Sequence, residues 1–557
     1  KIGGEDVNTV KNANFMNSLS GKVAGVNINA SSAGMGGAAR VVMRGPKSIT
    51  QSNGALYVID GVPVTNTSQG EVNNGRYSSQ PGSEGIADVN PEDIESISVL
   101  SGPAAAALYG SAAAQGVIMI TTKKGKEGRI QVSVSNSTQF NRPFVMPEFQ
   151  TSYVNRRNEV TSWGSKAESQ FGTYEPKNFF NTGINLVENV SFSQQFNKTS
   201  VYVSGTRLDD GSKIPGAKYN RSNLTSRIFT NFGNDDRWSL DAKIQYIRSY
   251  AKNRPISGAN TNNYFYTMFT MPISLDITQF KNSINPENGN MYWWEKGSGQ
   301  NPYWAKDYNT NEDLRNRFLL NFALKYQFTD WLSAEAKAGS DMYFTESETK
   351  LYAGSPSSRT GRYSFGEHKF YENNFSLLLT AQKDNVIGKF GGVATLGGNL
   401  MERKSTGLSS SLKELIAPNL FWLTNGKDSD RSINPSYSHR KTNSLYGSLS
   451  INYDGWAFLE GTFRNDWSST LIKKNRSYFY PSISASWVVS DMLNKLDAPL
   501  PKWFSYAKAR VSFAQVGNDL EPYQLYNTYS IGSIPYTNGV GASKGSTLYD
   551  SNVRSEL

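Results

Sequence analysis

The stretch from Asn90 to Lys123 reads NPEDIESISVLSGPAAAALYGSAAAQGVIMITTK, and the first part of the chain is organised around it. Asn90 can accept hydrogen bonds from the amides of a short helix, and Pro91 suits the first helical position. The acidic residues that follow lie at the positive end of that helix. Two strands are predicted next, at 94–100 and 117–122.

Small residues connect these two strands. Gly102 and Pro103 turn the chain, and the alanine-rich segment from Pro103 to Tyr109 is predicted to be helical. This helix is expected to end at Gly110, a residue that can adopt a positive φ, and the second strand is expected to begin directly after Gly116. The stretch is therefore expected to be a helix–strand–helix–strand unit in which backbones approach closely.

The composition argues against several classes of function. With no cysteine among 557 residues, the chain has no disulfide framework, thiolate nucleophile or zinc–thiolate site. Its two histidines, His368 and His439, are far apart in sequence, which argues against a catalytic triad or a histidine-rich metal site. The carboxylate pairs 209–210 and 235–236 fall in turns, whereas a glycosidase holds its two carboxyls a defined distance apart. We expect no enzyme, no metal and no cofactor.

The positive charge is concentrated in the second part of the chain. Lys and Arg number 57 against 47 Asp and Glu, a formal charge of +10. Residues 1–128 contain ten of each sign, so the excess lies beyond them. No nucleic-acid motif or dense basic cluster is present, so we expect no nucleic-acid partner. Contact with anionic lipid headgroups accounts better for the excess.

After residue 128 the sequence changes to long segments in which apolar and polar residues alternate. Between Phe318 and Phe328 the even-numbered positions are apolar, and Asn321, Lys325 and Gln327 fall on the opposite face. A period of two predicts a sheet with one apolar and one polar face, which a soluble sandwich also has. The predicted strands are 129–140, 184–196, 199–208, 219–232, 237–250, 314–328, 331–345, 367–383, 390–405, 440–453, 456–468, 479–489 and 506–516, with another near 523–532.

The connections distinguish a transmembrane barrel from a sandwich. Short turns flanked by aromatic residues recur at 232–238, 328–331 and 453–456, and they alternate with long loops such as 141–183 and 251–313. Tight turns at one end and long loops at the other are typical of a transmembrane β-barrel. Aromatic residues beside the short turns are placed for an interfacial girdle.

Four segments carry a family resemblance: LSGKVAGV at 19–26, RVVMRG at 40–45, ALYVIDGVPV at 55–64 and the 90–122 stretch. In order and spacing they resemble the plug domain of the SusC/RagA family of TonB-dependent outer-membrane transporters. Segments 463–469, 480–487 and 507–518 resemble mid-barrel motifs of the same family. The residues that carry the plug signature are Arg40, Arg44, Gly45, Tyr57, Asp60, Gly61, Pro63, Tyr109, Gly110 and Gly116.

The resemblance implies a mainly β protein with two domains. A small α+β plug at 1–127 is expected inside a transmembrane antiparallel β-barrel that begins at 128 and runs to 557. The complete family barrel has twenty-two strands, and about 13–14 are predicted here. We therefore expect the natural protein to be longer, with further carboxy-terminal strands. Segments matching the family's TonB box and β-sandwich extension are not found, so energy coupling is implied by the resemblance alone.

The implied function is TonB-dependent import of an oligosaccharide or oligopeptide across the outer membrane of a Gram-negative bacterium of Bacteroidota type. The implied partners are a SusD-like surface lipoprotein acting as a lid, the TonB–ExbB–ExbD complex, and outer-membrane lipid and lipopolysaccharide. Two alternatives stay open. One is a siderophore or cobalamin receptor without a lid, and the other is a secreted glycan-binding β-protein.

Two features are candidates for function within this scheme. Arg40 and Arg44 flank an apolar strand upstream of Asp60, and ion pairs among them are expected either to latch the plug reversibly or only to fix it. The 251–313 loop is rich in aromatic residues, which are expected to contact cargo or lid at the outer mouth, or to pack against neighbouring loops. The candidate cargo or lid residues are Trp293, Trp294, Tyr303 and Trp304.

Overall fold

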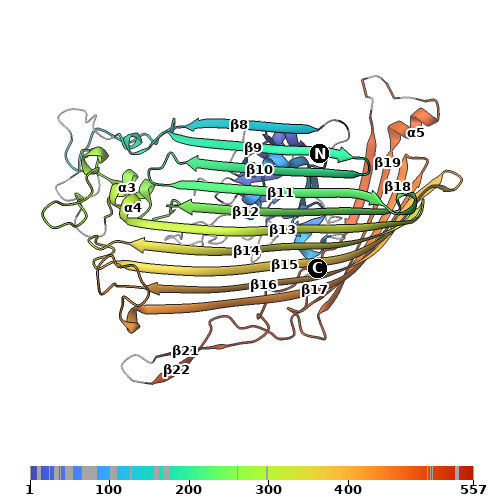
Figure 1. Cartoon of the computed structure of the whole chain (residues 1–557). Helices are drawn as coiled ribbons and strands as arrows, with labels where there is room; N and C mark the ends of the chain where they lie inside the picture. The colour runs from blue at the N-terminus through green and yellow to red at the C-terminus, as the bar shows by residue number, and fades with distance from the viewer. Residues whose placement is uncertain are drawn as a thin grey trace.

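The structure is a computed structural model that describes most of the chain between residues 2 and 555 (Figure 1). The description leaves out 9–13, 24, 30–36, 38, 44, 46–53, 65–84, 101–108, 126–127, 129, 156–161, 167–174, 257, 260, 296–298, 499, 502, 505 and 534–538. The molecule is mainly β, as predicted, with a small sheet in the first part of the chain and a large antiparallel sheet in the second. None of the helices in the described ranges is both long and apolar enough to cross a bilayer.

The plug contains a five-stranded sheet in the order β1-β6-β7-β4-β5 and a separate β2-β3 hairpin. The predicted plug strands are confirmed, and β4 and β7 pair in parallel while the other neighbours are antiparallel. The strands are β1 (Ile2–Gly3), β2 (Val26–Asn29), β3 (Arg40–Met43), β4 (Leu56–Ile59), β5 (Val62–Val64), β6 (Ile94–Leu100) and β7 (Val117–Thr122). The short helices are α1 (Gly4–Asn8), η1 (Phe15–Leu19), η2 (Gly85–Asp88), η3 (Pro91–Asp93) and η4 (Ser111–Ala113).

The stretch around β6 and β7 folds as its residues predict. Asn90 caps η3 by accepting a hydrogen bond of 3.2 Å from the Glu92 amide. Gly110 and Gly116 have φ of +77° and +98°, so both occupy the left-handed region that favours glycine. The predicted helix between Pro103 and Tyr109 lies almost entirely outside the described residues.

The large sheet contains thirteen strands in strict sequence order from β8 to β20, each antiparallel to the next. In Figure 1 they run side by side as one curved sheet, with the plug behind β8 to β13. The strands are β8 (Gln131–Asn141), β9 (Gly183–Phe196), β10 (Thr199–Gly211), β11 (Lys218–Phe232), β12 (Trp238–Lys252), β13 (Asn309–Thr329), β14 (Leu332–Leu351), β15 (Arg362–Ile387), β16 (Phe390–Leu412), β17 (Arg431–Tyr453), β18 (Ala457–Ser468), β19 (Ser477–Val488) and β20 (Lys508–Ala514).

The predicted strands of this sheet are confirmed, but several extend further at the long-loop end. β17 begins at Arg431 rather than 440, and Pro435 lies in register with Leu408. The apolar side chains in this added part, Ile433 and Tyr437, are 59% and 55% exposed, so ladder pairing with β16 holds the segment rather than burial of one face. The strand expected near 523–532 is wrong as a member of this sheet, since β21 (Tyr529–Ser533) pairs with β22 (Val540–Lys544) instead.

Short turns gather at one end of the strands and long loops at the other. The turns use positive φ where the chain reverses, at Asn197 (50°), Asp454 (50°) and Gly455 (75°). The aromatic residues beside the turns form contacts across strands, with ring centroids 4.5 Å apart for Trp238 and Tyr326. The remaining helices are η5 (Pro176–Phe179), η6 (Asn234–Asp236), α3 (Tyr264–Thr270), η7 (Ile277–Phe280), α4 (Pro302–Tyr308), η8 (Asp428–Asp430) and α5 (Val489–Lys495).

The two faces of β13 follow the predicted register. Phe318 and Phe322 are exposed on the outer face, whereas Asn321 points inward and donates a hydrogen bond of 3.3 Å to the Asp60 carbonyl oxygen. The inward residue Leu319 joins the buried plug core together with Ile247 of β12. The large sheet therefore turns its polar face toward the plug and leaves the apolar face outward.

The register of β13 leads to a labelling prediction. Since the chain has no cysteine, a single Cys introduced at position 322 should react with a lipid-soluble thiol reagent in the membrane, and a Cys at 321 should not. A charge at Phe322 should cost about 2–4 kcal/mol of stability, as for lipid-facing positions near the midplane. Stronger labelling at 321 than at 322 would contradict this register.

Candidate functional site

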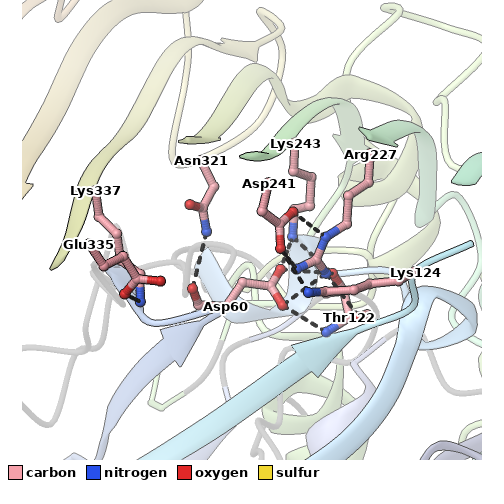
Figure 2. Close-up of polar contacts among 9 residues, drawn as sticks. All are labelled: Asp60, Thr122, Lys124, Arg227, Asp241, Lys243, Asn321, Glu335 and Lys337. Atoms are coloured by element: carbon pink, nitrogen blue, oxygen red, sulfur yellow. Dashed lines mark hydrogen bonds and ion pairs between the residues drawn. The ribbon is translucent and has the colours of Figure 1, made fainter. Parts of the chain in front are cut away.

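The candidate site lies where the plug meets the inner face of the large sheet, which we call the wall. Asp60 and Gly61 form the turn between β4 and β5, with φ of 50° and 85°. The turn places the Asp60 side chain at the end of the plug sheet, facing β11 and β12 of the wall (Figure 2).

Asp60 accepts contacts from both the plug and the wall. Lys243 Nζ of β12 lies 2.7 Å from one carboxylate oxygen, and Arg227 Nη1 of β11 lies 3.2 Å from the other. Within the plug, the Thr122 amide and hydroxyl donate to the same carboxylate at 2.9 and 2.7 Å. One side chain therefore ties the last residue of β7 to two strands of the wall.

Arg227 is shared between this contact and a second carboxylate. Its guanidinium also donates to both oxygens of Asp241 at 2.8 and 2.7 Å, and Lys124 of the plug lies 3.0 Å from Asp241. Figure 2 shows the Asp241, Arg227 and Lys124 side chains converging with Asp60 and Thr122. We call the set Asp60, Arg227, Lys243 and Asp241 the latch.

The Asp60 carboxylate of the latch is buried and stays ionised. Burial by itself would raise the pKa of the Asp60 carboxyl, but Lys243 and Arg227 outweigh it and lower that pKa below its ordinary value of 3.8. Truncating one partner of such a group leaves the others charged and desolvated, which costs more than the pair itself contributes. Removing one partner of the latch is therefore expected to destabilise the seated plug, whatever the intact latch contributes to its stability.

The lowered pKa predicts how the latch responds to acid. A carboxyl whose folded pKa is depressed contributes stability above its unfolded pKa, and that contribution is lost as pH falls through the folded value. We expect plug protection in hydrogen exchange to be constant from about pH 8 to pH 5 and to fall only below 3.8. Asp60→Asn should reduce the acid-dependent loss. A wild-type loss centred near neutral pH would rule out this assignment.

A second contact centres on Asp88 at the end of η2. Its carboxylate oxygens lie 2.7 Å from Arg315 Nη2 and 3.0 Å from Arg317 Nη1, both on β13. Burial opposes the charge of Asp88, but the two arginines lower its pKa. Arg317 also pairs with Asp341 of β14 at 2.8 Å, so the contact spans two wall strands.

Backbone carbonyls of η2 extend this second contact. Arg221 of β11 donates to the carbonyl oxygen of Ala87, and Asn223 donates to that of Asp88 at 2.7 Å. A short helix that ends in a buried position leaves carbonyls without intrahelical partners, and the wall side chains satisfy them. Strand β13 therefore holds the side chain of Asp88, and strand β11 holds backbone carbonyls of the same turn.

The 90–122 stretch supplies a third contact. Asp93 is buried and accepts hydrogen bonds from Tyr202, Ser204 and Thr225 at 2.9, 2.6 and 2.7 Å. Asn90 donates to Thr206 at 2.8 Å while its oxygen caps η3. The residues that shape this helix end thus also attach it to β10 and β11.

The residues of the predicted plug signature have several different structural roles. Tyr57 is buried in the plug core, and Pro63 lies on the edge strand β5, where a residue without an amide donor is tolerated. Tyr109 packs near Val58 and Val117. A Cβ on Gly110 would lie 2.9 Å from Arg464 Nη2, so glycine permits close approach to the wall there.

The expected pairing of Asp60 with Arg40 and Arg44 falls outside the described residues, since Arg44 and the side chain of Arg40 are not described. Gly45 is exposed with φ of 82°. The partners that the structure gives Asp60 come from the wall, and the sequence analysis missed them. The wall partners of Asp60 and Asp88 could have been suspected from the sequence only because each is a cation on the polar face of an alternating strand; they are Arg227, Lys243, Arg315 and Arg317.

Most of the large aromatic side chains in the loop between β12 and β13 are buried or partly buried against one another and against neighbouring loops. Trp293, Tyr303 and Trp304 are only 9%, 6% and 2% exposed, so these three side chains follow the second of the two expectations, packing against neighbouring loops. Phe179 of the β8–β9 loop lies against Tyr303, with centroids 5.1 Å apart, so the packing joins two loops. We call this buried set the outer-loop cluster; it contains Phe179, Ile214, Ala217, Tyr264, Met268, Met271, Ile277, Phe280, Trp293, Tyr303 and Ala305.

Comparison with known families and curated proteins relates the chain to TonB-dependent receptors. A model of the TonB-dependent receptor plug domain matches residues 1–117. TonB-dependent receptor SusC of Bacteroides thetaiotaomicron is 27% identical over 515 residues, covering 86% of this chain and 48% of that protein. TonB-dependent receptor P26 of Formosa agariphila is 26% identical over 570 residues, covering 94% and 51%. The chain spans about half the length of these curated relatives.

Solved structures share the fold at low sequence identity. The RagAB peptide importer in the open-open state has a TM-score of 0.79 and 19% identity, covering 100% of this chain and 63% of that chain. A mutant of the ferric enterobactin receptor PfeA from Pseudomonas aeruginosa has a TM-score of 0.54 and 14% identity, covering 100% and 66%. The shared fold is that of a barrel receptor with a plug.

Proposed function

Because the plug match, the SusC-like relatives and the RagAB-like fold support a transporter of SusC/RagA type, we propose that this chain imports a large nutrient across the outer membrane by a TonB-dependent mechanism. In this proposal residues 1–127 form the plug and residues from 128 onward belong to the barrel. The cargo is an oligosaccharide or an oligopeptide.

The observation that carries the proposal is the way the plug is held. Buried charges at Asp60 and Asp88 fasten it to wall strands β11 to β14. A polar lumen wide enough for a large solute needs such a plug, and separating buried ion pairs is costly. Opening therefore requires an outside source of work, and coupling through TonB and ExbB–ExbD to the inner membrane is the source we propose.

The outer loops supply the entry side of the proposed transporter. Tyr266 and Tyr292 are 40% and 47% exposed, whereas the outer-loop cluster beneath them is buried. Rigid aromatic anchors of this kind dominate contacts in protein interfaces. We propose that this loop, with Trp293, Trp294, Tyr303 and Trp304 as its support, meets cargo or a SusD-like lipoprotein lid.

Uptake by the source bacterium tests the proposal. Deleting the gene should abolish growth on an oligosaccharide or oligopeptide pool, and a proton uncoupler should stop uptake in the parent strain. A SusD-like lipoprotein should co-purify with the tagged transporter. Uptake that is limited to ferric siderophore or cobalamin, without a co-purifying lipoprotein, would favour the alternative receptor class and reject the proposal.

Tyr266 and Tyr292 give a finer test at the loop. Replacing both with Ala should reduce uptake or lipoprotein recovery several-fold while the transporter remains assembled in the membrane. The Phe replacements at the same positions keep the flat rings and should retain most of both activities. If the Ala variants match the parent in both measurements, this loop has no part in entry.

A further inference from the structure

A cavity of about 400 Å³ lies between plug and wall beside the latch. The inner-face residues around it, such as Phe229 and Ser239, lie close to the 232–238 turn, so the cavity is near the short-turn end of the strands. Its cationic side chains are Lys124, Arg227, Lys325 and Lys337, and its carboxylates are Asp60, Asp241 and Glu335. The cavity is far larger than the ~30 Å³ share of one water molecule, so it has room for a carboxylate-bearing group.

Each carboxylate that lines the cavity forms an ion pair with a cationic side chain, and one further cationic side chain lines the cavity without such a pair among the described residues. Glu335 pairs with Lys337 at 2.7 Å, as Figure 2 shows, and Asp60 and Asp241 are held in the latch. Lys325 lies opposite Glu335 in the strand register, yet it makes no ion pair with any residue that the structure describes. The cavity therefore has an excess of positive charge when the plug is seated.

Withdrawal of the plug would increase this excess. Asp60 belongs to the plug, whereas Arg227, Lys243 and Asp241 belong to the wall. When Asp60 leaves, Arg227 keeps Asp241, but Lys243 is 4% exposed and has Asp60 as its only carboxylate partner among the described residues. While the plug still covers Lys243, an ammonium without a partner is strongly unfavourable, so the first step of opening becomes easier if another anion takes the place of Asp60.

We propose that the latch is a carboxylate exchange site: Asp60 occupies it in the closed state, and a carboxylate of the cargo occupies it as Asp60 withdraws. Lys325 adds positive charge in the same cavity, which attracts the cargo carboxylate down from the outer mouth as the plug opens, and Arg227 and Lys243 then bind it. Arg227 can donate to that carboxylate from Nη1, which contacts Asp60 in the closed state, while its Nε and Nη2 stay with Asp241, and Lys243 adds a point charge. The substrate class is thus an anionic polymer, either a peptide with free carboxylates or an oligosaccharide with uronic acids. This inference rests on the proposed import function for its transport step only.

Chemical rescue tests the binding site without any transport. In the purified Asp60→Ala variant, millimolar acetate should raise the melting temperature in a saturable manner, because it replaces the missing carboxylate. Acetamide, a neutral molecule of nearly the same shape, should not, and acetate should not shift the parent protein. Equal effects of acetate and acetamide, or no effect of either, would overturn the site. If Asp60→Ala does not accumulate, Asp60→Ser serves in the same titration.

A double variant separates a specific site from a general salt effect. Replacing Lys243 with Met in the Asp60→Ala background removes the cation that needs a partner. The double variant should be more stable than Asp60→Ala alone and should no longer respond to acetate. A response to acetate that persists unchanged would show that the anion binds elsewhere, and it would overturn the assignment.

Matched cargo pairs test the exchange step in the intact cells. Peptides with free and amidated carboxyl ends form one pair, and oligouronates and their methyl esters form the other. The parent should import the charged member of one pair several-fold faster, and Lys325→Gln should remove this preference while uptake of the neutral member persists. Equal import of both members overturns the exchange step. If neither pair enters although acetate rescues Asp60→Ala, the import function fails and the carboxylate site stands.

Discussion

Replacing Asp88 with Asn should lower the stability of the seated plug by about 3–5 kcal/mol, the cost of breaking a buried ion pair from one side. Arg315 is 3% exposed and has Asp88 as its only carboxylate partner among the described residues. Arg317 keeps Asp341 but loses its second carboxylate. The variant therefore leaves buried positive charge next to the plug without compensation.

Hydrogen exchange measures this effect at the plug itself. Amides of β6 and β7 should lose about 100-fold or more of their protection, since each 1.4 kcal/mol corresponds to a factor of ten. Asp428→Asn is the matched control, because that side chain is 95% exposed and, among the residues that the structure describes, forms an ion pair only with Arg431, three residues away. Equal protection in Asp88→Asn and the control would mean that the plug is held by other contacts.

Truncating Phe179 to Ala should disrupt the outer loops, with a local cost of about 3–5 kcal/mol. The Phe179 side chain is 2% exposed, and its ring centroid lies 5.6 Å from that of Tyr264 and 5.1 Å from that of Tyr303. The ring therefore joins the β8–β9 loop to helices α3 and α4. Its loss leaves a cavity at the junction of two loops. We expect the loops to become sensitive to protease and uptake to fall.

Phe144 provides the control for this variant. It lies in the same loop and is 96% exposed, so Phe144→Ala removes the same atoms without opening a cavity. Protease sensitivity of the outer loops should rise in Phe179→Ala and stay at the parent level in Phe144→Ala. Unchanged sensitivity in both variants would show that the outer-loop cluster does not hold the loops together.

The latch and the outer-loop cluster lie at different levels of the molecule, and their predicted effects differ accordingly. In the proposed mechanism, the latch controls whether the plug can leave the wall, and the cluster controls the shape of the entry side. A variant in one should leave the other intact, since no residue is shared between them. Measuring plug exchange and loop proteolysis on the same samples tests this independence.

The strands and their faces were determined by the sequence alone. Alternation at period two predicts which residues of β13 face outward, and short aromatic turns predict where hairpins close. The Asp60–Gly61 turn and the Asn90 cap were equally readable, because both depend on residues within a few positions of one another. Local rules of this kind need no knowledge of what lies across the lumen.

The partners of Asp60 and Asp88 were decided only by the tertiary structure. Lys243 is 183 positions from Asp60, and Arg315 is 227 positions from Asp88. The outer-loop aromatics are similar, since the sequence left contact with cargo or lid and packing against neighbouring loops as alternatives, and the fold packs Trp293 and Tyr303 among the loops. In each case the deciding factor is desolvation: charges and rings removed from water must find partners, and the curved arrangement of strands around the plug determines which residues, far apart in the chain, are close enough to provide them.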